Sequence, residues 1–91
     1  MDLNEAVGLA LKQQRLSKGL SQETIGASQS YISDIERGLK AISVEKLDEL
    51  AKNMGVHPLT ILTNSYLKID ANTDLQQIFE LISKELSQLE N

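Results

Sequence analysis

The chain has no cysteine, one proline, one histidine and three aromatic residues among its 91 residues. Without cysteine there is no disulfide, no thiolate metal site and no cysteine nucleophile, so stability must come from packing or association. The single histidine and the lack of a glycine-rich phosphate loop provide little for catalysis, and we do not expect an enzyme. No cofactor or metal is expected either, because His57 has no second ligand at a suitable spacing.

Long apolar runs and a basic N-terminal segment are missing as well. A membrane span needs about 20 mostly apolar residues, and a secretion signal needs basic residues before an apolar stretch. We therefore expect a cytoplasmic protein with no membrane partner. A chain of this length fits one small domain with an appendage, which leaves no room for a separate ligand domain, and no small-molecule ligand is expected.

The formal net charge of −4 is unevenly distributed. Residues 1–67 carry seven basic and eight acidic side chains, whereas residues 68–91 carry two and five. Within residues 12–40 the balance reverses to five basic against three acidic. A local positive face is therefore possible, and the global charge does not exclude DNA as a partner.

Cap residues followed by apolar positions at spacings of three and four recur along the chain, which predicts an all-α fold. Asp2, Ser21, Ser28 and Ser43 are the expected N-caps, and Pro58 suits a first helical turn. The expected helices cover about 3–18, a very short stretch ended by Gly26, 29–37, 44–54, 57–67 and 74–90. Ala27 is expected to bridge the second and third helices.

Apolar stripes mark the faces that should be buried. The first helix offers Leu3, Val7, Ala10 and Leu11, the third Ile32 and Ile35, and the fourth Leu47, Leu50 and Ala51. We expect residues 1–67 to form one domain, 68–73 a linker, and 74–91 a separate amphipathic helix that begins with a capping box of Thr73 and Gln76.

Residues 20–43 combine a short helix, a glycine-containing turn and a helix whose exposed side carries Gln29, Ser30, Ser33 and Arg37. A helix fits the major groove, where glutamine can bond adenine, arginine can bond guanine and serine can meet either a base or a phosphate. Free amides at Ser28 and Gln29 suit a phosphate oxygen. On periodicity alone, a solvated helix face explains the pattern equally well.

The stretch LSQETIGASQSYISDIERG from Leu20 to Gly38, the lead-in R-x-x-x-G-L-S-Q from Arg15, and the later KLDELAKNMGVHPLTIL resemble the XRE family of bacterial and phage repressor-like helix-turn-helix proteins. The resemblance covers about residues 6–63 and implies a five-helix DNA-binding domain, usually dimeric, that regulates transcription at the bacterial nucleoid. By matching positions it implies DNA contacts by Gln22 and Gln29, and an ion pair between Arg15 and Glu36.

Combining the resemblance with the exposed polar side chains gives a set of expected contacts to double-stranded DNA. Phosphate contacts are expected from Gln22, Lys40, Ser43 and the helix N-termini, and base contacts from Gln29, Ser30, Ser33 and Arg37. The full set is Gln22, Ser28, Gln29, Ser30, Tyr31, Ser33, Arg37, Lys40 and Ser43. For Tyr31 a DNA contact and a place covering the core remain equally open, and Asp34 is expected to pair within the chain, with Arg37 or Lys18.

Between Gln22 and Ile32 the chain is four residues shorter than the usual family pattern. Four residues turn an α-helix by about 400° and lengthen it by about 6 Å, so their loss removes one turn while nearly keeping the phase. We therefore expect a functional motif with a shortened second helix.

The last helix repeats apolar residues at spacings of 4, 3, 4 and 3, which predicts a seam of two heptads formed by Leu75, Phe79, Ile82, Leu86 and Leu89. The helix either packs on its own domain or pairs with the same helix of a second copy beside Leu59 and Leu62; we favour a homodimer. The leading functional prediction is a repressor that binds a palindromic operator. The alternative is a protein-binding module of the antitoxin or anti-repressor type that acts through this acidic helix.

Overall fold

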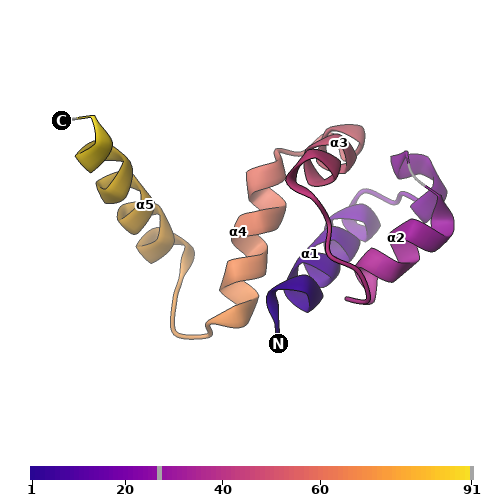
Figure 1. Cartoon of the computed structure of the whole chain (residues 1–91), viewed down its shortest axis with the longest axis horizontal. Coiled ribbons are helices and arrows are strands. Elements are labelled where there is room, and N and C mark those ends of the chain that lie inside the picture. Colours follow the sequence, from indigo (N-terminus) through magenta and orange to yellow (C-terminus); the bar gives the residue numbers. More distant parts are fainter. Residues whose placement is uncertain (27, 91) are drawn as a thin grey trace.

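The computed structural model describes residues 1–26 and 28–90, and its regular elements there are all helical, as the sequence predicts. Ala27 lies outside the described residues. Figure 1 shows the first four α-helices gathered into one body, with the last helix standing apart beyond α4. The elements are α1 (Leu3–Ser17), the 3₁₀ helix η1 (Gln22–Ile25), α2 (Gln29–Glu36), α3 (Val44–Met54), α4 (Pro58–Ile69) and α5 (Leu75–Leu89).

Side-chain caps start three of the helices where the sequence predicts them. Asp2, Ser28 and Ser43 each accept a hydrogen bond from the amide three residues later, at 2.8, 3.2 and 3.0 Å. The prediction for Ser21 is wrong in one respect, because its hydroxyl contacts the Thr24 hydroxyl and caps no amide. The Thr24 hydroxyl donates to the Ser21 carbonyl at 2.8 Å, and the Thr24 amide donates to the same carbonyl at 3.2 Å, which closes this single turn.

The core of the body lies where α1, α2, α3 and α4 meet. Its buried side chains are Ala10, Leu11, Ile25, Ile32, Ile35, Leu47, Leu50, Ala51, Met54 and Ile61. Leu3 does not join the predicted α1 stripe: it is 41% exposed, because it stands on the first turn of α1 at the edge of a groove next to Val44 and Leu59. Burial on α1 begins at Ala6.

A glycine allows α1 and α2 to approach closely. A Cβ atom at Gly8 would collide with the backbone carbonyl oxygen of Ile35, near the C-terminal end of α2. Backbone atoms move less easily than side chains, so only glycine fits this crossing without a shift. The position of α2 on α1 therefore depends on Gly8.

The connection between α4 and α5 begins after Ile69, since Lys68 and Ile69 continue α4. The predicted capping box of Thr73 and Gln76 is wrong by one residue: Asp74 caps α5, and Asp74 and Gln77 form the box. The Thr73 hydroxyl instead donates to the Asp70 carboxylate at 2.6 Å, in the turn before α5. The Thr73 hydroxyl and the Asn72 amide, both donating to this carboxylate, hold the pKa of Asp70 below its usual range.

No described residue of α5 is buried, and the helix carries a row of exposed apolar side chains. Phe79 is 53% exposed and Ile82 45% exposed. Each helix within the described residues is too short or too polar to span a lipid bilayer.

Candidate nucleic-acid interface

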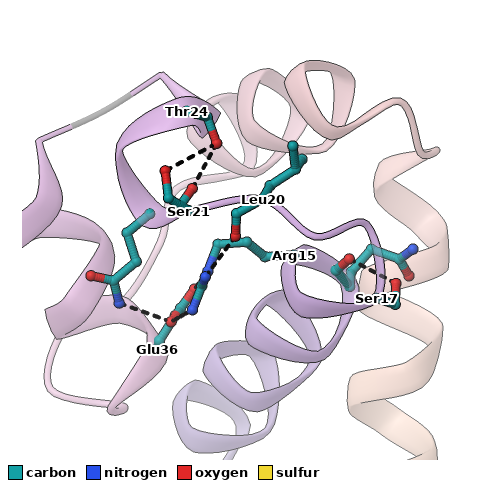
Figure 2. Close-up of polar contacts among 8 residues, drawn as sticks. Arg15, Ser17, Leu20, Ser21, Thr24 and Glu36 are labelled. Carbon is teal, nitrogen blue, oxygen red and sulfur yellow. Dashed lines mark hydrogen bonds and ion pairs between the residues drawn. The ribbon is translucent and has the colours of Figure 1, made fainter.

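A buried ion pair holds the elements of the predicted site together (Figure 2). Arg15 on α1 donates from Nε and Nη2 to the two carboxylate oxygens of Glu36 on α2, at 2.7 and 2.9 Å. Its third donor, Nη1, reaches the carbonyl of Leu20 at 2.8 Å. The hydrogen bond to Glu36 raises the pKa of Arg15 above its already high value, so the guanidinium stays charged. The pair fixes the C-terminal end of α2 against α1.

Gln22, the first residue of η1, is tied to the same carboxylate. Its Nε2 donates to Oε1 of Glu36 at 3.0 Å, and the side chain is half-buried. One amide proton and the amide oxygen of Gln22 do not take part in this bond. Glu36 therefore fixes the orientation of the Gln22 amide as well as that of α2.

The exposed side of α2 and its C-cap residue, Arg37, carry polar side chains. Gln29, Ser30 and Arg37 are exposed, and Ser33 is half-buried. The Ser28 hydroxyl oxygen accepts from the Tyr31 amide, so Ser28 is already used as the helix cap. Among the ion pairs of the described residues, none involves Arg37, whose guanidinium is left to face solvent. The face therefore presents hydrogen-bonding groups on a rigid helix.

Tyr31 lies half-buried against the core beside two lysines. The Nζ atoms of Lys40 and Lys46 lie 5.9 and 6.0 Å from the centre of its ring, within the range of cation–π attraction. Of the two readings left open for Tyr31, packing against the core is what the structure shows.

Each of these two lysines also contacts a carboxylate. Lys40 lies 3.5 Å from Asp34, and Lys46 lies 2.6 Å from Glu49. Asp34 thus pairs within the chain as expected, though with Lys40 rather than Arg37 or Lys18. The ion pair with Glu49 raises the pKa of Lys46.

Sequence reasoning overlooked Lys46, which stands on the first turn of α3. The spacing of its own helix indicates only an i,i+3 pair with Glu49. Its approach to Tyr31 is a tertiary contact between α3 and α2. Ser43, a predicted contact, uses its hydroxyl to accept from the Lys46 amide at 3.0 Å.

The residues predicted for dimerisation are divided between two helices. Leu59 on α4 is 60% exposed, and Leu62 is half-buried. An apolar groove of about 570 Å³ between α4 and α5 is lined by Leu59, Thr63, Leu67, Leu75 and Phe79, among others. The structure therefore brings Leu59 to one groove with the first turns of the α5 seam, while Leu86 and Leu89 lie farther along α5.

Three comparisons place these features among known proteins. A family model described as helix-turn-helix matches residues 11–61. The uncharacterized HTH-type transcriptional regulator y4dJ of Sinorhizobium fredii (strain NBRC 101917 / NGR234) is 39% identical over 67 residues, which make up 69% of this chain and 87% of that protein. The control protein C.BamHI of Bacillus amyloliquefaciens is 38% identical over 60 residues, or 60% of this chain and 74% of that protein.

A solved structure shares the fold as well as part of the sequence. The crystal structure of the clp gene regulator ClgR from C. glutamicum superposes with a TM-score of 0.68 at 31% identity. The match covers 72% of this chain and 90% of that chain.

Proposed function

The chain belongs to the XRE-type helix-turn-helix family of transcriptional regulators, and on that premise we propose that it binds a palindromic DNA operator as a homodimer and represses the promoter it occupies. The observation that carries the proposal is the exposed row of Gln29, Ser30 and Arg37 on a helix held rigidly by the Arg15–Glu36 pair. No chemical step is needed, because occupancy alone blocks a promoter.

In the proposed complex α2 lies in the major groove. Gln29 at its first turn bonds an adenine, Ser30 and Ser33 meet base edges or phosphates, and Arg37 reaches a guanine or the backbone. Gln22 uses its remaining amide proton for a phosphate, while its bond to Glu36 keeps the amide pointing in one direction. Lys40 and the amides at the N-terminus of α3 add further phosphate contacts.

A second copy would place two such helices on one face of the duplex. Recognition helices about 34 Å apart meet successive major grooves, so a two-fold dimer reads a palindrome. The support for dimerisation is the apolar seam of α5, because a row of large apolar side chains in water favours association. Control of activity then rests on protein concentration, a partner or proteolysis.

Selection of bound duplexes from a random pool is the experiment that tests this proposal. We expect enrichment of one sequence with two-fold symmetry. Affinity should fall steeply with salt, at a log–log slope of about −0.9 for each phosphate neutralised. Failure to prefer any selected fragment over random DNA at moderate salt would defeat the assignment.

A second candidate function rests on the same exposed helix. The seam of α5 is flanked by Glu85 and Glu90, so an acidic amphipathic surface is available for a different protein. In that case the chain acts as a protein-binding module of the antitoxin or anti-repressor type. Co-purification from the native host separates the two: a 1:1 complex that forms without DNA, with no measurable DNA binding, favours the module.

A further inference from the structure

Two lysine ammonium groups gather around one aromatic ring beside the exposed face of α2. Lys40, from the connection between α2 and α3, and Lys46, from α3, both lie within about 6 Å of the Tyr31 ring centre. Their separation cannot exceed the sum of these two distances. Because one DNA strand carries a phosphate for every ~3.4 Å of helix axis, two cations within this separation can contact nearby phosphates of a single strand.

The position of the two lysines follows from α2 itself. Tyr31 comes directly after Ser30, and Asp34 stands one turn after Ser30 on the same side of the helix. Since Lys40 contacts Asp34, its ammonium group lies at the edge of the face that carries Ser30. A DNA strand that borders the groove occupied by α2 would pass this edge.

Both lysines form ion pairs with carboxylates in the free protein. Asp34 holds Lys40 at 3.5 Å, and Glu49 holds Lys46 at 2.6 Å. All four side chains remain partly exposed, with the lysines 56% and 36% accessible. Exposed ion pairs contribute only about 0–1 kcal/mol, so a phosphate that offers several oxygens can replace the carboxylates.

We propose that Lys40 and Lys46, both beside the Tyr31 ring, form one site for DNA backbone phosphate, and that Asp34 and Glu49 compete with the phosphate for these lysines. The inference rests on the proposed DNA-binding function. It adds Lys46 to the expected DNA contacts and assigns the two carboxylates a role that lowers the affinity for DNA. When DNA binds, the ion pairs between the carboxylates and the lysines break, and the carboxylates remain close to a phosphate. The lost ion pairs and the repulsion between like charges lower the affinity for DNA. Removing a carboxylate therefore strengthens DNA binding.

The test measures binding to a labelled random-sequence duplex of about 25 base pairs, long enough for two half-sites one helical turn apart. A random sequence suffices because phosphate contacts do not depend on sequence. Lys46→Gln should weaken binding and make the salt dependence shallower by about 0.9 per protomer in the log–log slope. Glu49→Gln should tighten binding about two- to fivefold, the range that one exposed ion pair supports.

Asp48→Asn is the matched control for Glu49→Gln. It removes one negative charge from the adjacent position of α3, where Asp48 pairs with Lys52 at 2.8 Å and makes no contact with the Lys46–Tyr31 group. A general charge effect would therefore raise affinity equally in both variants. We expect a smaller gain for Asp48→Asn. In a Lys46→Gln background, the gain from Glu49→Gln should fall to that same level.

The outcomes separate this inference from the proposed function. Equal gains for Glu49→Gln and Asp48→Asn, or an unchanged salt slope for Lys46→Gln, would overturn the phosphate site even if selection yields a clear operator. The expected pattern on random DNA, with no sequence enriched from the pool, would support the phosphate site and defeat sequence-specific regulation. Thermal unfolding of each variant checks that the fold is retained, which we expect because none of the substituted side chains is buried.

Discussion

Glu36 connects three elements with one carboxylate. It accepts two hydrogen bonds from Arg15 on α1 and one from Gln22 on η1, and its own position is the last residue of α2. Its side chain is only 3% exposed. A buried carboxylate is costly unless its partners are complete, and here the charged guanidinium and the amide supply them.

Replacing this carboxylate should therefore destabilise the body strongly. Glu36→Gln leaves the buried Arg15 without an opposite charge, and breaking one partner of a buried pair costs about 3–5 kcal/mol. We expect a loss at the lower end of that range, since glutamine still offers an acceptor oxygen. Urea unfolding followed by circular dichroism measures the loss. Asp48→Asn, which breaks an exposed pair, should change the unfolding free energy by under about 1 kcal/mol; a similar loss in both variants would refute the special role of Glu36.

At the scale of elements, the crossing of α1 and α2 depends on Gly8. Alanine normally stabilises a helix interior by about 1 kcal/mol relative to glycine. At this position the added methyl group meets the Ile35 carbonyl, and overpacking of this kind costs about 1–3 kcal/mol. We expect Gly8→Ala to lower the unfolding free energy and to weaken DNA binding by shifting α2.

Equilibrium unfolding and DNA titration of the same samples test both consequences. Lys12→Ala on the exposed side of α1 is the control, and it should leave the unfolding free energy nearly unchanged. An unchanged or raised stability for Gly8→Ala would show that the two helices can separate without cost.

The cap of α1 should make stability depend on pH in the acid range. The Glu5 amide, which donates to the Asp2 carboxylate at 2.8 Å, holds the pKa of Asp2 below its usual range. A carboxyl group whose pKa is lowered by folding stabilises the folded state above its unfolded pKa, and this contribution is lost as pH falls through the folded value. The melting temperature of Asp2→Ala should thus lie below that of the parent near pH 7, and the gap should shrink in acid.

Melting curves recorded from neutral to acid pH measure this gap. Asp74→Ala is the matched control, because Asp74 makes the same kind of cap on α5, which contributes nothing to the buried core. It should leave the melting of the body unchanged. A gap for Asp2→Ala that persists at the lowest pH would show that the charge on the cap is irrelevant.

The sequence predicts those features that depend on neighbouring residues. The caps at Asp2, Ser28 and Ser43 and the end of the short second element at Gly26 follow from local chemistry, and the shortness of that element follows from a residue count. The predicted cap of α5 lies one residue too early because Thr73 and Asp74 both suit an N-cap; in the structure Asp74 accepts from the Gln77 amide, while the Thr73 hydroxyl contacts Asp70.

Local sequence rules do not predict features that depend on contacts between distant parts of the chain. Leu3 lies at the helical spacing expected of a buried residue, but no neighbouring helix covers it. Lys46 has nothing in its own helix to indicate Tyr31. The link between Gln22 and Glu36 joins residues 14 positions apart, and neither helical period nor capping rules predict it.

At the scale of the whole molecule, the body and α5 differ in what they bury. The body has a closed core, whereas α5 extends away from it with every described residue exposed or half-exposed (Figure 1). Its seam of Leu75, Phe79, Ile82, Leu86 and Leu89 covers two heptads, fewer than the three or four that usually support an independent coiled coil. A dimer built on α5 therefore needs additional area, and the groove beside Leu59 supplies apolar surface next to the seam.

Placing two carboxylates in this seam tests the dimer. Phe79→Asp combined with Ile82→Asp should convert the protein to a monomer of 10.1 kDa, because charged side chains cannot be buried in an apolar interface without partners. Operator affinity should fall on the order of 10²-fold, since the two half-sites would no longer be linked. The body should keep its melting temperature, because α5 buries no residue against it.

Sedimentation and operator titration measure these two losses together. Lys84→Asp provides the control: it makes the net charge more negative by the same two units, from a position of α5 half a turn away from the seam. We expect this variant to remain dimeric and to bind DNA only slightly more weakly, through its added charge. If the Phe79→Asp, Ile82→Asp protein stays fully dimeric, α5 is not the interface. If it becomes monomeric yet keeps its operator affinity, dimerisation does not couple the half-sites.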